Sequence, residues 1–214
     1  EVLLRLAPHI IWPLTFVLPH DASMRPQWMI RAGLFLYDNL ARRATLPGSR
    51  RIALDRGPFK AALKPGTTAG FAYSDCWVED SRLVVLNAMD ARERGADIRT
   101  RTRFVTARRE GKGWRAEIES GSGRKYVTAR AIVNAGGPWV EKALAATGSN
   151  SPGHVRLIKG SHIVVPKLFE GGEAFILQND DKRVVFVIPY EGRYSLVGTT
   201  DIDFTGDPAT AAIT

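Results

Sequence analysis

The chain has 214 residues, of which 44% are hydrophobic and 24% are charged, and this composition is ordinary for a soluble globular protein. Its single cysteine, Cys76, excludes an internal disulfide, and no basic segment followed by a long apolar core indicates a secretory signal. The formal net charge of +8 permits an anionic partner: a nucleic acid, an anionic membrane surface or a small anionic substrate.

The first third of the chain is predicted to be helical and irregular. Residues 2–9 have the pattern of a helix tail that Pro8 stops. The apolar stretch 10–18 is too short to span a bilayer. Pro26 begins a predicted helix over 26–43 with a broad apolar face. Residues 50–70 are rich in Gly and Pro, which indicates a long excursion with one short helix.

The middle of the chain alternates strand and helix signals. Residues 70–77 are aromatic and alternating, which predicts a strand, and Asp80 caps a predicted helix over 81–94 that ends at Gly95. Glycine-rich turns then separate three short strands, which predicts a three-stranded meander over residues 103–109, 114–119 and 125–128.

The most informative segment follows the meander. The apolar, β-branched run 130–135 predicts a buried strand, and it breaks into Gly136-Gly137-Pro138-Trp139 before a predicted helix over 138–146. A strand that ends in two glycines before a helix lets the backbone approach a ligand closely. An ordinary strand-to-helix turn explains the same residues, so ligand contact rests on the neighbouring motifs.

The last part of the chain reads as β structure after a Gly/Ser/Asn/Pro-rich linker through Gly153. Strands are predicted over 155–165, 174–177, 183–188 and 194–199. The tripeptide Gly121-Ser122-Gly123 is a hairpin turn, because it lacks a third glycine and opens no helix; the dinucleotide fingerprint G-x-G-x-x-G is missing from this chain.

The positive charges are scattered along the sequence. In the run 99–103 the arginines occur at every second residue, which predicts the solvent face of a strand. No aromatic residues interleave with the arginines as a stacking platform for bases would require. This distribution favours a solvated surface over a nucleic-acid site, and a basic non-enzymatic nucleic-acid-binding module stays as a second alternative function.

Four long motifs, in chain order, carry a resemblance to a known family. The motifs are GFAYSDCWVED at residues 70–80, VNAGGPWV at 133–140, RLIKGSHIVVP at 156–166 and GTTD at 198–201. With these motifs, the chain closely resembles FAD-dependent glycerol-3-phosphate dehydrogenase, the aerobic, quinone-linked bacterial enzyme of the D-amino-acid-oxidase-like flavoprotein superfamily.

The resemblance implies the fold and the domain organisation. The fold class would be α/β (mixed α+β), with a partial FAD-binding Rossmann-like domain that includes the meander, plus an antiparallel-sheet substrate domain. Residues 1–70 would be the helical and loop part of the substrate domain, residues 71–150 the second half of the FAD-binding domain, and residues 151–214 the truncated substrate sheet. The chain would be an internal fragment, so we expect it to be inactive alone and to bind FAD weakly or not at all.

The resemblance also implies the chemistry. The family oxidises sn-glycerol 3-phosphate to dihydroxyacetone phosphate with FAD and passes the electrons to quinone. His162 matches a substrate-pocket position and is the candidate catalytic base, since an imidazole titrates near pH 6.5. Lys159 and Thr200 are the other candidate substrate-binding residues. From the residues alone, a lone histidine on a strand, such as His162, is more often structural, and Lys159 fits a surface lysine equally well.

The candidate cofactor-binding residues lie in two segments. Val105 matches the place where the family's meander presents backbone N–H and C=O groups to adenine. Ala135, Gly136, Gly137 and Trp139 match the turn near the flavin and its pyrophosphate, although Trp139 also suits plain packing. The central hypothesis is that His162 and the Gly136 backbone face a common cavity.

Partners and localisation follow from the resemblance. The parent protein would be cytoplasmic, peripheral to the inner face of the cytoplasmic membrane, with quinone as electron acceptor and a homodimer as assembly; nucleic acid is not an expected partner. The histidines and Cys76 show no ligand spacing, so no metal site is expected. The first alternative is another flavin oxidase of the superfamily that acts on an amino acid or amine.

Overall fold

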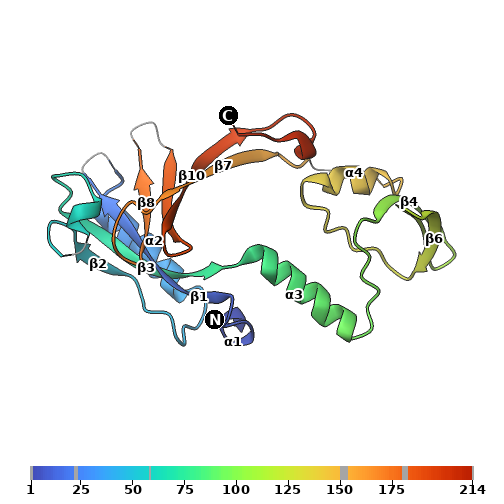
Figure 1. The fold of residues 1–214 in the computed structure, drawn as a ribbon, viewed down its shortest axis with the longest axis horizontal. Helices are drawn as coiled ribbons and strands as arrows, with labels where there is room; N and C mark the ends of the chain where they lie inside the picture. Colours follow the sequence, from blue (N-terminus) through green and yellow to red (C-terminus); the bar gives the residue numbers. More distant parts are fainter. Residues whose placement is uncertain (1, 22–23, 58, 150–153, 180–182, 214) are drawn as a thin grey trace. The chain divides into compact units, whose positions relative to one another are not determined.

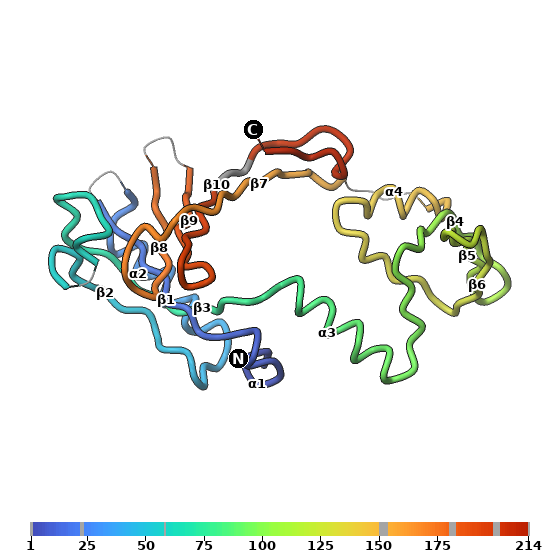
Figure 2. The backbone as a smooth tube through the Cα atoms, viewed as in Figure 1, coloured from blue at the N-terminus to red at the C-terminus, as the bar shows by residue number. Residues whose placement is uncertain are grey.

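The structure is a computed structural model that describes residues 2–21, 24–57, 59–149, 154–179 and 183–213. The chain forms two compact units, the first made of residues 1–87 and 160–201 and the second of residues 88–159 and 202–214. Figures 1 and 2 trace the chain through both units. The strand predicted at 70–77 belongs to the first unit. The functional division at residues 70 and 150 stays a prediction.

The first unit is built on a sheet of seven strands among the described residues, in the order β2-β3-β1-β8-β9-β10-β7 (Figure 1). β1 pairs with β3 in antiparallel register over ten residues and with β8 in parallel at Phe16 and Val17. The β2–β3, β8–β9 and β9–β10 ladders are antiparallel. The strands are β1 (Ile11–His20), β2 (Arg50–Ala53), β3 (Ala69–Val78), β7 (Ile158–Pro166), β8 (Ala174–Gln178), β9 (Val184–Tyr190) and β10 (Tyr194–Asp203).

Two apolar clusters hold the first unit together. The larger one joins Val17 of β1 to Leu54, Phe175 and Val187. Full burial of one such side chain contributes about 1.5–3 kcal/mol, so this cluster fixes the centre of the sheet. A smaller cluster around Ile10 attaches the beginning of the chain to the first turns of α3 (Asp80–Glu93).

Proline and glycine signals predict one end of each of the first three helices. α1 (Val2–Leu6) ends before Pro8, α2 (Gln27–Asn39) follows Pro26, and α3 ends before Gly95. The other end of α2 differs from the prediction, since the helix stops at Asn39 and not at residue 43. A short 3-10 helix, η1 (Lys60–Ala62), is the one helical turn expected in the 50–70 excursion, which also contributes β2. No helix in the described ranges has the length and apolar character needed to cross a membrane.

The apolar face of α2 is not part of a core. Tyr37 attaches the helix to β3 through a hydrogen bond from its hydroxyl to the Ser74 carbonyl at 3.2 Å. Other large apolar side chains of the helix and its end remain in solvent, with exposed fractions of 69% for Trp28, 66% for Leu36 and 80% for Leu40. The broad apolar face predicted from the sequence exists, but within this chain it faces water.

The second unit contains the predicted meander, a three-stranded antiparallel sheet in the order β4-β5-β6 (Figure 2). Arginine side chains cover its aromatic rings: the guanidinium of Arg109 lies 4.3 Å from the ring centroid of Trp114, and that of Arg115 lies 4.3 Å from that of Tyr126. The elements of this unit are β4 (Arg103–Glu110), β5 (Gly113–Ser120), β6 (Gly123–Ala129), η2 (Gly137–Trp139), α4 (Val140–Ala145) and η3 (Pro208–Thr210).

Two strand predictions are wrong. Residues 130–135 form no strand, and Val133 is 89% exposed, because no strand of the described residues lies beside this segment to share hydrogen bonds. The alternating arginines at 99–103 are not a strand face either. The backbone turns there, with Arg101 at a φ of 51°, and Arg99 pairs with Asp97 at 2.5 Å.

Candidate functional site

The turn that follows residue 133 is organised by one asparagine. The Asn134 side chain donates from Nδ2 to the Val140 carbonyl at 2.8 Å and accepts from the Gly136 N–H at 3.2 Å. Gly137 has a φ of 51°, which lies in the left-handed region that favours glycine. The sequence therefore folds into a compact turn that brings the backbone of residues 134–137 together at the start of η2 and α4.

A mostly apolar cavity of about 380 Å³ opens beside this turn. Its walls come from three places in the second unit: Phe104 and Trp114 from the meander, the segment 132–136, and Leu144 of α4. Ligand pockets have volumes of about 300–1,000 Å³ and are lined mainly by apolar side chains. Ala135 and Gly136 therefore border a space of ligand size, whereas Gly137 and Trp139 are not among its lining residues.

The meander has an irregularity at the predicted adenine position. The β4–β5 register runs from Phe104 opposite Ile118 to Thr106 opposite Glu117, so Val105 has no partner residue across the ladder. A β-bulge of this kind leaves one residue's main-chain groups out of the regular pairing. The main chain of Val105, rather than its side chain, is thus the feature that distinguishes this position.

Trp139 is held in place by a carboxylate. Its side chain hydrogen-bonds to Asp207, and the Lys142 ammonium lies 3.4 Å from the same carboxylate. The backbone N–H of Ala209, together with these neighbours, lowers the pKa of Asp207 below its ordinary value. Asp207 therefore stays ionised and ties η2 and α4 to the segment that precedes η3.

His162 lies on β7 against a glycine of the neighbouring strand. A Cβ atom built on Gly198 would lie 1.8 Å from Cδ2 and 2.2 Å from Nε2 of the imidazole. No side chain fits beneath the ring, so Gly198 is required for the observed position of His162. The residue is otherwise exposed to solvent, and Nδ1 is not among the three ring atoms nearest Gly198.

The two other candidate substrate residues, Lys159 and Thr200, belong to different units. Lys159 belongs to the second unit, where its ammonium donates to the Ala212 carbonyl at 2.9 Å. Thr200 belongs to the first unit and its backbone lies in β10, but its side chain lies outside the described residues. The structure thus assigns His162 and Thr200 to one unit, and Lys159, Val105 and the 134–139 turn to the other.

Sequence reasoning missed three residues of these sites. Gly198 carries a signal, because an isolated glycine in a strand pattern often marks a close approach of another group. Asn134 was also visible as an amide that precedes two glycines, a pattern typical of side-chain-to-backbone turns. Asp207 had no such signal. Among the described residues, no group of three or more His, Cys, Asp or Glu side chains is arranged to hold a metal ion.

Comparison with known proteins decides the family. The model of the DAO family, described as FAD dependent oxidoreductase, matches residues 1–214. The chain belongs to this family. The resemblance found in the four sequence motifs is therefore confirmed at the level of the FAD-dependent oxidoreductases.

Several curated relatives are similar along almost the whole chain. The glycerol-3-phosphate dehydrogenase of Pseudomonas aeruginosa is 54% identical, with 100% of this chain and 41% of the relative covered. The aerobic glycerol-3-phosphate dehydrogenase of Escherichia coli is 50% identical, with 100% and 42% covered. The D-erythritol 1-phosphate dehydrogenase of Brucella abortus is 53% identical, with 96% and 42% covered. The chain thus spans about two-fifths of the length of these relatives.

Solved structures confirm the fold. The glycerol-3-phosphate dehydrogenase of Bacillus halodurans, solved with FAD, matches with a TM-score of 0.75 at 21% identity, and the match covers 100% of this chain and 39% of that one. The glycine oxidase of Geobacillus kaustophilus matches with a TM-score of 0.62 at 16% identity, covering 95% and 52%. The mixed α/β fold expected from the sequence is confirmed.

Proposed function

We propose that the whole protein is an FAD-dependent dehydrogenase that oxidises sn-glycerol 3-phosphate to dihydroxyacetone phosphate. The observation that carries this proposal is the turn at Ala135 and Gly136, which borders a cavity of ligand size in a chain matched by the family model from end to end. The 50–54% identity to named phosphopolyol dehydrogenases supports the substrate class.

The described residues fit one part of a flavin dinucleotide. The bulge leaves Val105 without a partner residue across the β4–β5 ladder, and we propose that its main chain recognises the adenine; the turn at Gly136 and Gly137 lets a pyrophosphate or ring approach the backbone. Ala135 and Trp139 complete the set of proposed cofactor-binding residues. When bound, FAD supplies the hydride acceptor.

His162 is the proposed catalytic base. Oxidation of a secondary alcohol requires a group that takes the hydroxyl proton as the hydride leaves, and a neutral imidazole does this near pH 7. With Nε2 and Cδ2 held against Gly198, we assign this role to Nδ1 of His162.

The proposed substrate-binding residues match a phosphorylated alcohol. The Lys159 ammonium is a compact positive charge that attracts a phosphate, and it would exchange the Ala212 carbonyl for that anion. The Thr200 hydroxyl is proposed to hydrogen-bond the substrate. The chain's net charge of +8 assists the approach of an anionic substrate in general.

D-erythritol 1-phosphate is a second candidate substrate, because the Brucella relative is 53% identical, within one percentage point of the Pseudomonas enzyme. Both substrates are phosphate esters of polyols, so they require the same base and the same positive charge. An amine or amino-acid substrate is less well supported, since the glycine oxidase shares the fold at only 16% identity.

We also propose quinone as the electron acceptor, a homodimeric assembly, and a cytoplasmic position at the inner face of the membrane. The exposed apolar side chains of α2, among them Trp28 and Leu36, support contact with a membrane surface. Flotation of the whole protein with liposomes, sedimentation, and reduction of a soluble quinone analogue test these three points.

Steady-state kinetics of the purified whole protein tests the function. We expect turnover of sn-glycerol 3-phosphate or D-erythritol 1-phosphate and none of glycine. His162→Asn should lower kcat/KM by about 10²–10⁴-fold, as expected for loss of a general base. The matched control is His154→Asn, since the His154 side chain is 95% exposed. Preference for glycine, or equal activity of both variants, would refute the proposal.

A spectrum of the purified 214-residue chain tests the cofactor part separately. We expect weak or absent flavin bands and no turnover, because the described residues fit only part of the dinucleotide. Flavin bands at stoichiometric intensity would show that these residues are sufficient. A nucleic-acid-binding module would instead show affinity that falls by orders of magnitude with added salt, and a flat salt titration excludes it.

A further inference from the structure

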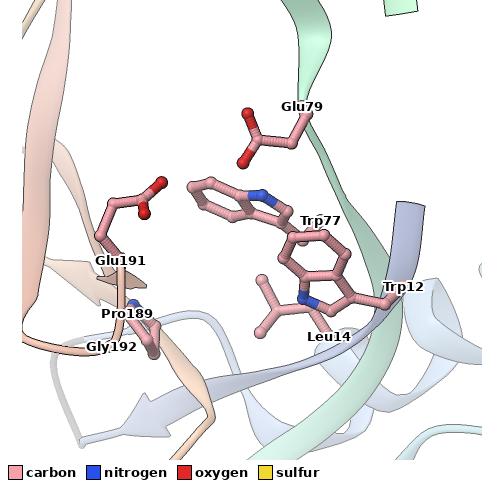
Figure 3. Close-up of a pocket in the computed structure, with 7 residues that line it drawn as sticks. All are labelled: Trp12, Leu14, Trp77, Glu79, Pro189, Glu191 and Gly192. Atoms are coloured by element: carbon pink, nitrogen blue, oxygen red, sulfur yellow. The ribbon is translucent and has the colours of Figure 1, made fainter. Parts of the chain in front are cut away.

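A cavity of about 290 Å³ in the first unit shares no lining residue with the sites described above. We call it the tryptophan pocket. Trp12 and Leu14 of β1 and Trp77 of β3 form its floor, while Glu79 and the β9–β10 turn with Glu191 form its sides (Figure 3). Its composition, two indoles and two carboxylates, points to a ligand chemistry that the dehydrogenase reaction does not use.

The aromatic floor is a direct product of strand register. Trp12 and Trp77 are opposite residues in the β1–β3 ladder, and their rings stack with centroids 6.1 Å apart and planes at 24°. The ring centroid of Tyr190 lies 6.0 Å from that of Trp77. Trp12 nevertheless keeps 43% of its surface exposed. A wide π surface that is open to solvent attracts cations, with tryptophan the strongest of the aromatic side chains.

The carboxylates are placed as counter-ions for such a cation. Neither Glu79 nor Glu191 has a hydrogen bond or ion pair from its carboxylate to the described residues, although the chain has 30 Lys and Arg residues against 22 Asp and Glu. None of the lining residues carries a positive charge. The two carboxylates come from different elements, and in Figure 3 both are directed toward the Trp77 indole.

The indole N–H of Trp77 is not available to a ligand in this pocket. Its Nε1 atom is shielded from solvent and has no hydrogen-bond partner among the described residues. An atom that a water molecule does not reach is equally out of reach of a ligand oxygen in the open pocket. Trp77 therefore offers a ligand its ring face and not its N–H.

We propose that the tryptophan pocket binds a small quaternary alkylammonium ion, the chemistry of tetramethylammonium and choline. The ammonium group would lie against the indole rings, with Glu79 and Glu191 compensating its charge.

Indole N–H resonances of the whole protein in ¹H–¹⁵N spectra test this proposal directly. The ligands are choline, tetramethylammonium, and the neutral choline analogue 3,3-dimethyl-1-butanol, each at constant ionic strength. We expect choline and tetramethylammonium to shift the signals of Trp12 and Trp77 saturably, and the neutral alcohol not to bind. Equal affinity for choline and the neutral alcohol would overturn the role of the positive charge.

Matched variants separate the pocket from general effects. Trp12→Leu and Glu191→Gln should each weaken choline binding by about 2- to 5-fold, as expected for an exposed cation–π contact or ion pair. The controls are Trp28→Leu and Glu93→Gln, which remove the same groups elsewhere and should leave the affinity unchanged. Absence of saturable choline shifts, equal shifts with the neutral alcohol, or equal losses in pocket and control variants would overturn the proposal.

Discussion

Replacement of Gly198 by alanine tests the contact on which the position of His162 depends. The new Cβ atom would lie 1.8 Å from Cδ2, 2.2 Å from Nε2 and 2.5 Å from Cγ of the imidazole. Non-bonded carbon atoms approach to about 3.5 Å, so the ring must move by at least about 1.7 Å. Because His162 is exposed to solvent, the ring can turn outward rather than force the strands apart.

The structure therefore predicts a large effect on activity and a small one on stability. A displacement of about 1 Å at a reacting group can cost about 10²-fold in rate, so we expect kcat/KM of the whole protein to fall by about 10²-fold or more, equivalent to about 2.7 kcal/mol. The φ of Gly198 lies outside the left-handed region, so alanine is tolerated there and the free energy of unfolding should change by less than about 1 kcal/mol.

Steady-state kinetics and denaturant melts give kcat/KM and the free energy of unfolding of Gly198→Ala, with Gly121→Ala as the control. Gly121 lies in a turn where an added Cβ meets nothing within 4 Å, so its variant should be unchanged in both assays. The double variant Gly198→Ala/His162→Asn should be no worse than His162→Asn alone, because both changes remove the same group. Unchanged activity of Gly198→Ala would refute the reasoning, and additive losses would show that Gly198 acts independently of His162.

Three further predictions concern other parts of the chain. Burial, followed by the negative charge of Asp75, raises the pKa of Tyr73 from 10.0 to about 12. The stability that the neutral phenol contributes is therefore complete below pH 10 and is lost between pH 10 and about 12. In a pH titration, tyrosinate absorbance should show a late step that Tyr73→Phe removes. Asn134→Ala should lower the free energy of unfolding by about 1 kcal/mol in denaturant melts, and an unchanged midpoint would contradict the turn's dependence on Asn134. Val105→Ala should leave the FAD affinity of the whole protein unchanged, whereas Val105→Pro should weaken it by about tenfold; a loss with alanine would assign recognition to the side chain.

Local signals predicted the elements that depend on local interactions. The three strands of the meander, the ends of α3 and the start of α2 all follow from turn residues, caps and prolines a few residues away. Such signals act within one or two turns of the chain. They succeed because the interactions that create these elements join neighbours in sequence.

The failure at residues 130–135 shows the limit of this reasoning. The composition of the segment is that of a buried parallel strand, but a strand exists only where another strand completes its hydrogen bonds. No strand of the described residues pairs with it, so Val133 is left exposed. The sequence pattern shows that the segment is suited to a strand, but a strand forms there only if another strand pairs with it.

The candidate site residues also differ in whether local sequence predicts them. Ala135 and Gly136 were predicted from local residue types, and they do border a cavity. The bulge at Val105 and the contact of Gly198 with His162 depend on the register between strands. The isolated glycine at 198 marks a close approach, but the sequence does not say which group approaches, and the bulge has no local marker. The residue types were therefore predictable, while the atoms that make each position useful were not.

The apolar stretch 10–18 carries this argument furthest. It contains Pro13 and is followed by Pro19, yet most of it lies in β1, an interior strand of the sheet, because the pairing of β1 with β8 is confined to Phe16 and Val17, away from both prolines. The ten-residue ladder with β3 places Trp12 opposite Trp77. A shift of one residue in this ladder would turn one indole to the other face and remove the floor of the tryptophan pocket. Choline binding therefore depends on the register of the β1–β3 ladder. During unfolding, choline affinity should be lost together with β1–β3 pairing, before the separate meander unfolds.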